Sequence, residues 1–360
     1  MALLTYQTFK QKQPKRFAKQ LPKGVRPVLV DWGNGGSPAA IKFADGQIST
    51  GSCIRCINPP CTEYSDKELE LAVFKDFPAD KNNSVCPTSA ITWPLEASAP
   101  VIAPASCISC GLCVSRCPTR AIYLDEQGAH INDQPNDHFR IQNIPNSLEI
   151  VEATAKLFEK VPEHGVYLTE NDELLRRFRE HFEEVSKDQS AQFPNHLARN
   201  LLIAAGIGAA MRRRGDTNIR MDLVLGPPGV EQGTSEVELG TDVLEAPRNI
   251  LDNVAVLVAR YEISKDHIVP IIVSLALPNQ RSEYWQVIKD VKEVLDIKIG
   301  SITIGALIII VWSRALITIE TGEELYLDAD LTSLRLRLEK ILKRELNITT
   351  GYPGLLESEK

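Results

Sequence analysis

The distribution of cysteine is the feature that most restricts how this chain can fold. All eight cysteines lie between residues 53 and 117 of the 360-residue chain. Seven of them form two tight runs, which are Cys53, Cys56 and Cys61, and Cys107, Cys110, Cys113 and Cys117. The eighth, Cys86, is followed directly by proline, as Cys117 is. We therefore expect this segment to be organised around a group that the thiols bind.

The second run has the spacing C-x2-C-x2-C-x3-C-P, which is typical of segments that hold cubane iron–sulfur clusters. A cubane takes four soft thiolate ligands, and three ligands that are each two residues apart require a tightly curled backbone. Gly111, between Cys110 and Cys113, supplies the conformational freedom that this curl needs. Eight thiolates are enough for two [4Fe-4S] clusters, and such clusters serve one-electron transfer.

An internal repeat supports this interpretation. Residues 86–93 (Cys-Pro-Thr-Ser-Ala-Ile-Thr-Trp) align without a gap with residues 117–124 (Cys-Pro-Thr-Arg-Ala-Ile-Tyr-Leu), and each copy is predicted to end in a short strand. On these motifs, roughly residues 50–132 resemble the bacterial-type dicluster ferredoxin family. The resemblance implies an α+β module with crossed ligation, in which the cysteine before proline binds the cluster of the other half. The implied ligand sets are Cys53, Cys56, Cys61 and Cys117 for one cluster, and Cys86, Cys107, Cys110 and Cys113 for the other.

The first half of this module departs from the family pattern. Four residues, Ile-Asn-Pro-Pro, separate Cys56 from Cys61, where the family usually has two. A long insertion of mixed charge, residues 62–85, follows and is predicted to be helical around residues 67–74. The number of ligands is unchanged, but the insertion would shield or tune its cluster, because solvent access shifts a cluster's potential.

Two other uses of eight cysteines fit the sequence less well. A disulfide framework would suit a secreted chain, but the N-terminus has no signal-peptide pattern. Zinc modules more often carry paired C-x2-C knuckles than the spacing of the second run. Cluster ligands must also stay reduced until the metal arrives, so we expect a cytoplasmic protein.

Length and composition indicate an ordinary globular protein. A chain of 360 residues, 43% hydrophobic and 24% charged, predicts two or three domains with real cores. The net charge of −7 argues against general affinity for nucleic acid, although it is compatible with a local basic patch. The longest apolar stretch, residues 302–311, is too short to span a membrane and is rich in β-branched residues, so it predicts a buried strand.

Changes in composition divide the chain into five parts. Residues 1–49 are a basic arm with a strand at 27–31, and seven lysines and arginines lie between positions 10 and 26 with no acidic residue. Such an arm is either a docking element for an acidic partner or nucleic acid, or a solvated tail. The other parts are the cluster module (50–135), a linker with helices at 146–160 and 169–187 (136–190), an α/β domain (191–350) and a tail (351–360). The second of these helices has an apolar stripe formed by Leu174, Leu175, Phe178, Phe182 and Val185.

The α/β domain is predicted from its alternating patterns. We expect, in chain order, a helix at 196–211, strands at 219–225 and 234–239, a helix at 247–261, a strand at 269–277 and a final helix at 331–346. Gly206 and Gly208 fall inside the first of these helices, where they would serve packing. We expect residues 226–229, Gly-Pro-Pro-Gly, to join the first two strands as a hairpin.

Three carboxylates lie on that predicted hairpin. Asp222 is on the first strand, and Glu236 and Glu238 share one face of the second, so the three would converge. Converging carboxylates hold Mg2+ or Mn2+ for attack on a phosphodiester. Roughly residues 195–312 resemble the PD-(D/E)XK (restriction-endonuclease-like) nuclease fold. The sequence departs from the family in two ways: Glu238 stands where the family carries its catalytic lysine, and one strand is missing before Asp222. Without the lysine, the domain could be an inactive relative. The alternative is an ordinary hairpin with a solvated acidic face.

The sequence thus predicts an iron–sulfur protein that transfers electrons to a partner protein or to its own C-terminal domain. One alternative is a nuclease-like protein that processes DNA and uses its clusters for structure or redox sensing. Another is a non-catalytic assembly or docking protein whose clusters only brace a surface.

Overall fold

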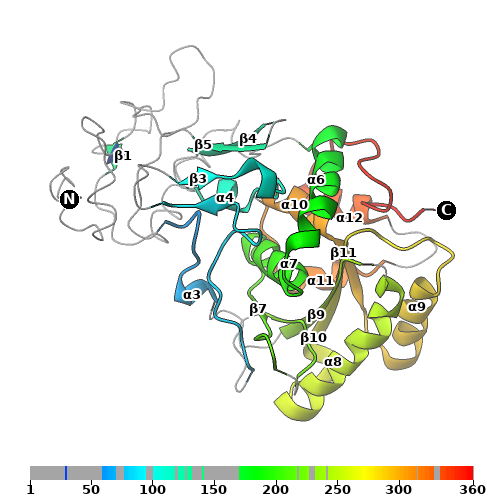
Figure 1. Ribbon diagram of the computed structural model, residues 1–360. Helices are drawn as coiled ribbons and strands as arrows, with labels where there is room; N and C mark the ends of the chain where they lie inside the picture. Colours follow the sequence, from blue (N-terminus) through cyan, green and yellow to red (C-terminus); the bar gives the residue numbers. More distant parts are fainter. Residues whose placement is uncertain are drawn as a thin grey trace, which may run out of the picture. The chain divides into compact units, whose positions relative to one another are not determined.

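The structure is a computed structural model (Figure 1). The residues that it describes are 29–30, 59–69, 77–94, 100–117, 121–125, 128–131, 140–141, 170–216, 219–226, 232–240, 242–313, 315–327 and 333–359. They belong to two units: Met1–Ser65 with Ser84–Leu168, and Asp66–Asn83 with Thr169–Lys360. The predicted helix at 146–160 lies outside the described residues.

The first unit is built on short strands. The strand β2 (Ile91–Thr92) pairs antiparallel with β3 (Val101–Ile102), and β4 (Ile122–Asp125) pairs antiparallel with β5 (Gly128–Ile131). The strands β2 and β4 begin at the isoleucine that ends each Cys-Pro-Thr-x-Ala-Ile copy, as the repeat predicts. A parallel pair, β1 (Leu29–Val30) with β6 (Arg140–Ile141), completes the described strands, and β1 lies within the strand expected at 27–31. The short helix α4 (Leu112–Ser115) lies inside the second cysteine run.

The second unit alternates helices and strands. Its longer segment begins with α6 (Asp172–Val185) and α7 (Phe193–Ala204). The strands and helices that follow are β7 (Ala209–Met211), β8 (Leu223–Leu225), β9 (Gln232–Glu238), α8 (Ala246–Tyr261), β10 (Ile268–Ser274), α9 (Glu283–Leu295), β11 (Gly300–Thr303), α10 (Ile304–Trp312), α11 (Thr321–Glu324) and α12 (Leu334–Leu342). The insertion contributes a short helix, α3 (Asp66–Leu69), to this unit.

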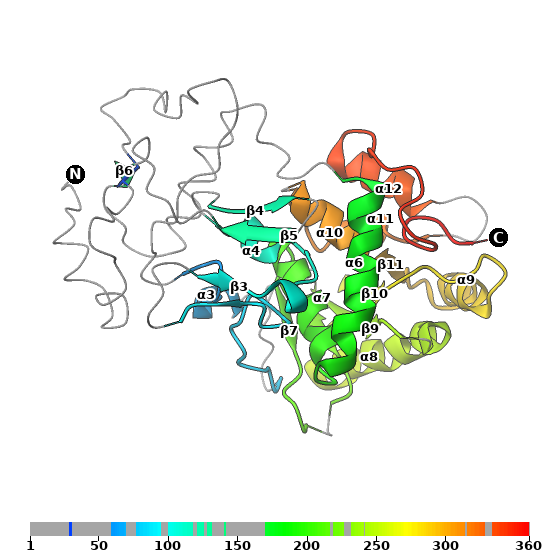
Figure 2. The same ribbon diagram turned by 45° about the horizontal axis from the view of Figure 1, so that its top comes forward.

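These strands form one mixed sheet in the order β11-β10-β9-β8-β7. The strands β9, β10 and β11 are parallel, whereas β7 and β8 run as an antiparallel pair beside β9. The two successive parallel crossovers place α8 and α9 on one face, because such connections are right-handed. Figures 1 and 2 show α7 and α10 on the opposite face of the sheet. The central strand β10 is buried along its whole length, as expected for a strand covered on both faces.

The apolar stretch at 302–311 is not the single strand that its β-branched residues predict. It is divided at Thr303, where β11 ends and the buried helix α10 begins. The Thr303 side chain caps this helix, because its Oγ1 accepts a hydrogen bond from the Ala306 amide at 3.1 Å. All residues of α10 are buried, so the stretch has no polar face whose period would distinguish a helix from a strand.

Two other predicted helices end earlier than expected. The helix predicted at 196–211 stops at Ala204, and Gly206 then adopts a left-handed conformation with φ of 103°. The residues after it form β7, so the strand that seemed to be missing before Asp222 is present. The final helix is α12, which ends where Lys343 turns left-handed, with φ of 55°. In contrast, α6 and its buried apolar stripe, and the helix α8, are confirmed near their predicted limits.

Both edges of the sheet are covered. Residues from the insertion pair with the outer edge of β7, where the Asp80 amide donates to the Met211 carbonyl at 2.8 Å and the Arg213 amide donates to the Pro78 carbonyl at 2.7 Å. At the other edge, the Ser301 amide donates to the Leu325 carbonyl at 3.0 Å. Covered edges prevent the sheet from pairing with other chains.

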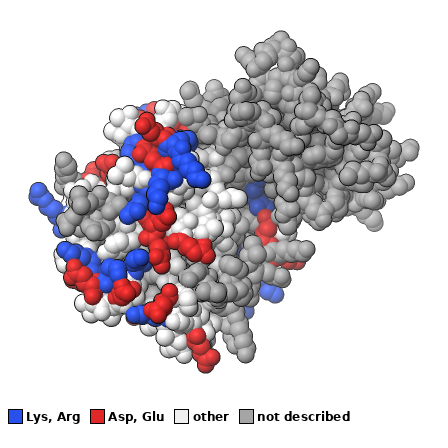
Figure 3. Space-filling view, turned by 180° about the vertical axis from the view of Figure 1, so that it is seen from behind, with Lys and Arg blue, Asp and Glu red and all other residues white. Residues whose placement is uncertain are grey.

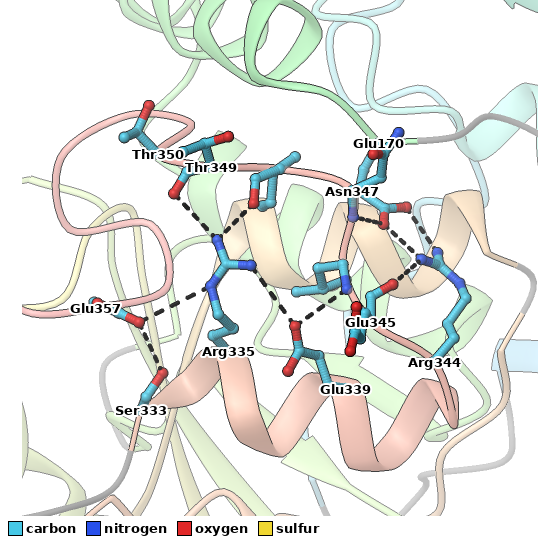
Figure 4. Close-up of polar contacts among 12 residues, drawn as sticks. Glu170, Ser333, Arg335, Glu339, Arg344, Glu345, Asn347, Thr349, Thr350 and Glu357 are labelled. Atoms are coloured by element: carbon cyan, nitrogen blue, oxygen red, sulfur yellow. Dashed lines mark hydrogen bonds and ion pairs between the residues drawn. The ribbon is translucent and has the colours of Figure 1, made fainter.

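A polar network fastens the C-terminal segment to the start of this unit (Figure 4). Arg344, just after α12, donates to both carboxylate oxygens of the fully buried Glu170, at 2.6 and 2.7 Å. The Asn347 amide donates to the same carboxylate at 2.9 Å. Next to it, the Asp172 carboxylate accepts hydrogen bonds from the amides of residues 349–351. The last residues are therefore part of the core, and Tyr352, Leu355 and Leu356 are buried.

None of the described helices is long and apolar enough to cross a membrane.

Candidate functional site

Four cysteines line one pocket in the first unit. Cys86 comes from the loop before β2. Of the other three, Cys107 and Cys110 come from the segment between β3 and α4, and Cys113 comes from α4 itself. The remaining described lining residues carry no charge; they are Thr88, Ala90, Ile91, Ile102, Ile108, Ser109, Gly111, Leu112 and Ala129. The pocket thus combines one cysteine of the first half-site with three of the second.

The backbone around these cysteines curls as their spacing predicts. Gly111 is left-handed, with φ of 81°, and stands directly before α4, whose first turn carries Cys113. Ser109 is also left-handed, with φ of 56°. Two left-handed residues so close together reverse the chain sharply, which points the three thiols into the same pocket. The expected role of Gly111 is therefore confirmed.

The thiols of this pocket are so buried that their ionised forms need a nearby positive charge to be stable. Burial, followed by the neighbouring thiols, raises the pKa of Cys110 and Cys113 far above the ordinary value. Burial also raises the pKa of Cys107, although backbone hydrogen bonds at Ser109 and Ala129 oppose the change. Iron supplies the positive charge that stabilises such thiolates, so this set of donors fits a [4Fe-4S] cluster.

Backbone and hydroxyl groups also contact the sulfur of Cys86. The Ala90 amide donates a hydrogen bond to this sulfur at 3.2 Å, and the Thr88 hydroxyl lies 3.4 Å from it. Amide hydrogen bonds to ligand sulfurs are one of the ways in which a protein sets the potential of a cluster. None of the six described cysteines forms a disulfide.

Two further cysteines lie in the hydrophobic core of the first unit. Cys61 and Cys117 are both buried, and they belong to one cluster of side chains with Ile91, Val114, Ala121 and Ile122. Cys61 is held in a turn, because the amides of Thr62 and Glu63 both donate to the Pro59 carbonyl. Cys53 and Cys56 lie outside the described residues.

Two of the three predicted carboxylates come together in the second unit. Asp222, just before β8, accepts hydrogen bonds from the Asn195 side chain at 2.9 Å and from the Val237 amide at 3.1 Å. Glu236, on β9, accepts one from the Asn253 side chain of α8 at 3.0 Å. Glu238 instead accepts from the Gly240 amide in its own turn, at 2.9 Å. No three His, Cys, Asp or Glu side chains in the described parts of the chain are grouped to hold a single metal ion.

The two carboxylates influence each other electrostatically. Burial raises the pKa of Asp222. Burial and then the charge of Asp222 raise the pKa of Glu236 to about 7, against the opposing effect of hydrogen bonds from Asn253 and Asn249. The sequence did not single out these asparagines. A usable signal was present, because positions 249 and 253 are four residues apart and share one face of the predicted helix.

This raised pKa predicts a pH dependence of stability. The folded protein holds a proton on Glu236 up to about pH 7, whereas an ordinary glutamate loses it near pH 4.5. The contribution of this proton to the free energy of unfolding is therefore fully present below pH 4.5, and it is lost as the pH rises toward 7. Between about pH 5 and 7.5 the unsubstituted protein should lose on the order of 2 kcal/mol relative to Glu236→Gln.

Urea unfolding of both proteins in the presence of EDTA at a series of pH values measures this difference. Glu180→Gln is the matched control, because its carboxylate is exposed on α6, and its curve should follow that of the unsubstituted protein. If the unfolding free energies of Glu236→Gln and of the unsubstituted protein change with pH in the same way, the folded protein does not hold a proton on Glu236.

Comparison with known proteins gives one match. The sequence model of the family described as "4Fe-4S binding domain" matches residues 100–123, which include Cys107, Cys110, Cys113 and Cys117. No curated protein and no solved structure matches the chain. The chain therefore carries a ferredoxin-like segment that binds a 4Fe-4S cluster.

Proposed function

We propose that this protein holds two [4Fe-4S] clusters and transfers single electrons between a redox partner protein and a second acceptor, which is another protein or its own second unit. The observation that carries the proposal is the pocket shared by Cys86 with Cys107, Cys110 and Cys113. Cys86 comes from the first copy of the repeat, so its presence there is what crossed ligation requires. We call this site the Cys86 cluster.

The second site consists of Cys53, Cys56, Cys61 and Cys117, and we call it the Cys61 cluster. Its support is the burial of Cys61 and Cys117 in one group of side chains, although they are far apart in sequence. Three cysteines of the second run line the pocket with Cys86. Cys117 is the fourth cysteine of that run, and it is not among the lining residues of this pocket. A bound cluster would supply reversible one-electron chemistry at each site.

The chain's own residues have three tasks in this function. The cysteines bind the iron, and the apolar lining of the Cys86 pocket excludes water from it. The amide of Ala90 and the backbone around Ser109 direct hydrogen bonds toward the ligand sulfurs. Water exclusion and hydrogen bonding together set the potential at which an electron enters.

Anaerobic purification followed by iron and sulfide analysis and an EPR redox titration tests the proposal. We expect about eight irons and eight sulfides per chain and two interacting reduced signals, which is two cubanes. Zinc at these positions, or four irons, would overturn the two-cluster proposal. Clusters that neither gain nor lose an electron would instead favour the docking or assembly alternative.

A second candidate function concerns the second unit. The succession of α7, the three antiparallel strands β7 to β9, α8 and the parallel strand β10 is the order of elements in the PD-(D/E)XK nuclease-like fold. The pairing of Asp222 with Glu236 at one end of β8 and β9 favours the same reading, with Mg2+ or Mn2+ as the metal. One observation weakens it: Glu238 is in the place of the catalytic lysine. On the face of the molecule in Figure 3, acidic and basic side chains of the described residues are mixed.

Cleavage assays decide this second function. If it is correct, the protein cleaves DNA with Mg2+ or Mn2+, and both Asp222→Asn and Glu236→Gln abolish the cleavage while the iron content stays unchanged. Arg176→Gln, at an exposed position on α6, is the control that should leave cleavage intact. Absence of metal-dependent cleavage by the unsubstituted protein would dismiss the nuclease activity.

A further inference from the structure

Arg116 is a charged side chain that is buried in the first unit. Only 9% of it is exposed. Its Nε donates a hydrogen bond to the Pro60 carbonyl at 2.6 Å, and its guanidinium carbon lies 4.2 Å from the centre of the Tyr64 ring. The Tyr64 ring is itself buried. A guanidinium group remains protonated in proteins, so the interior of this unit holds a permanent positive charge.

Arg116 and its hydrogen-bond partner Pro60 each stand next to a cysteine of the proposed Cys61 cluster. Arg116 directly precedes Cys117, and its hydrogen-bond partner Pro60 directly precedes Cys61. Neighbouring Cα atoms are only ~3.8 Å apart. A single side chain therefore ties together the two segments from which Cys61 and Cys117 project. Pro60 belongs to the four-residue spacer by which this chain departs from the ferredoxin pattern, so Arg116 fixes the unusual part of the loop.

The surroundings of the Cys86 cluster differ in charge. The described residues that line its pocket are cysteines, apolar residues, glycine, serine and threonine, and none is charged. Reduction adds one electron, and thus one negative charge, to a cluster and its four thiolates. A nearby positive charge stabilises this more negative state, and it does so more strongly in a buried environment of low dielectric constant.

We infer that Arg116 is the positioning residue of the Cys61 cluster and that it raises the reduction potential of this cluster. The inference rests on the proposed function. The reaction in question is the transfer of one electron from an external one-electron donor to the oxidised cluster, with no bond formed or broken and no proton taken up. The two clusters would differ in this respect, because the guanidinium is hydrogen-bonded beside Cys61 and the described residues that line the Cys86 pocket carry no charge.

Arg116→Gln tests the inference, since glutamine keeps a donor for the Pro60 carbonyl but removes the charge. An anaerobic redox titration with dithionite as the electron donor, followed by EPR, should show one midpoint lowered by the equivalent of a tenfold or larger change in the equilibrium constant, ~59 mV for one electron. The shifted signal should be the one that disappears in Cys61→Ala. Arg176→Gln removes one exposed positive charge from α6 and controls for net charge; its two midpoints should match those of the unsubstituted protein.

Iron analysis separates the possible failures. If the unsubstituted protein lacks eight irons, the proposed function fails. If Arg116→Gln has eight irons and both midpoints are unchanged, or if the midpoint of the Cys86 cluster is the one that moves, only the inference about Arg116 is overturned. If Arg116→Gln keeps four irons, Arg116→Lys decides, because lysine retains the charge. A midpoint in Arg116→Lys within tenfold of the unsubstituted value supports the inference, and a larger shift overturns it.

Discussion

Cys117→Ala is expected to remove the Cys61 cluster and to leave the Cys86 cluster intact, although Cys117 follows the ligands of the Cys86 cluster directly in the sequence. The reason is that Cys107, Cys110 and Cys113 already share their pocket with Cys86, and a cubane takes four protein ligands. The iron content should fall to about half, and the remaining EPR signal should be the same as in Cys61→Ala.

Cys86→Ala should have the complementary effect. Its surviving signal is expected to be the one that Cys117→Ala loses, and the double variant Cys86→Ala/Cys117→Ala should contain almost no iron. Ser106→Ala, in the residue before Cys107, is the matched control and should retain both signals. If Cys117→Ala and Cys107→Ala lose the same signal, each run binds its own cluster, and crossed ligation is wrong.

Arg344→Met should cost the protein about 3–5 kcal/mol of unfolding free energy, because it leaves the Glu170 carboxylate buried without its partner. Glu170 is fully buried and receives two hydrogen bonds from the Arg344 guanidinium. Urea denaturation followed by far-UV circular dichroism measures the loss. Arg176→Met is the matched control, since its ion pair with Glu173 is exposed and should contribute at most about 1 kcal/mol.

The double variant Glu170→Leu/Arg344→Met distinguishes two causes of the destabilisation: the loss of the ion pair itself, and the burial of a carboxylate without a positive partner. It should recover most of the stability, because it leaves no uncompensated charge in the core. If Arg344→Met were no more destabilising than Arg176→Met, the buried pair would have no role in stability.

The same network predicts a loss of stability in acid. Burial by itself would raise the pKa of Glu170, but hydrogen bonds from Arg344 and Asn347 outweigh it, and the pKa is lowered from its ordinary value of 4.5. A lowered folded-state pKa contributes stability above the unfolded pKa, and this contribution is lost as the pH falls through the folded value. The pH dependence of the unfolding free energy below about pH 4.5 should therefore be weaker in the double variant.

The sequence predicted the parts of this protein in which local chemistry determines structure. The cysteine spacing indicated the 4Fe-4S binding segment, and the left-handed Gly111 sits where the curl of that segment requires it. The period of α6 identified its five buried apolar residues, because a helix with one apolar face has a distinct pattern. The antiparallel pairing of β8 with β9 was also predicted, from the Gly-Pro-Pro-Gly sequence at 226–229.

The remaining features depend on long-range contacts. The stretch at 302–311 is apolar on every side, and only its burial in the sheet unit and the Thr303 cap favour a helix over a strand. The contact of Arg116 with Pro60 joins residues that are 56 positions apart. No local pattern signals either feature. The crossed sets of cysteine ligands, the domain limits and the three-carboxylate site stay predictions.

The insertion between Cys61 and Cys86 has a consequence for how this protein can be divided. The chain leaves the cysteine-rich unit after Ser65, contributes Asp66–Asn83 to the other unit, where it borders β7, and then returns. With the passage at Leu168, the backbone therefore crosses between the units three times. No single cut in the chain separates the two units. Cleavage at Leu168 would still leave Asp66–Asn83, which belongs to the second unit, attached to the first. Each unit consists of two separate segments of the chain, so neither can be produced alone as one continuous piece.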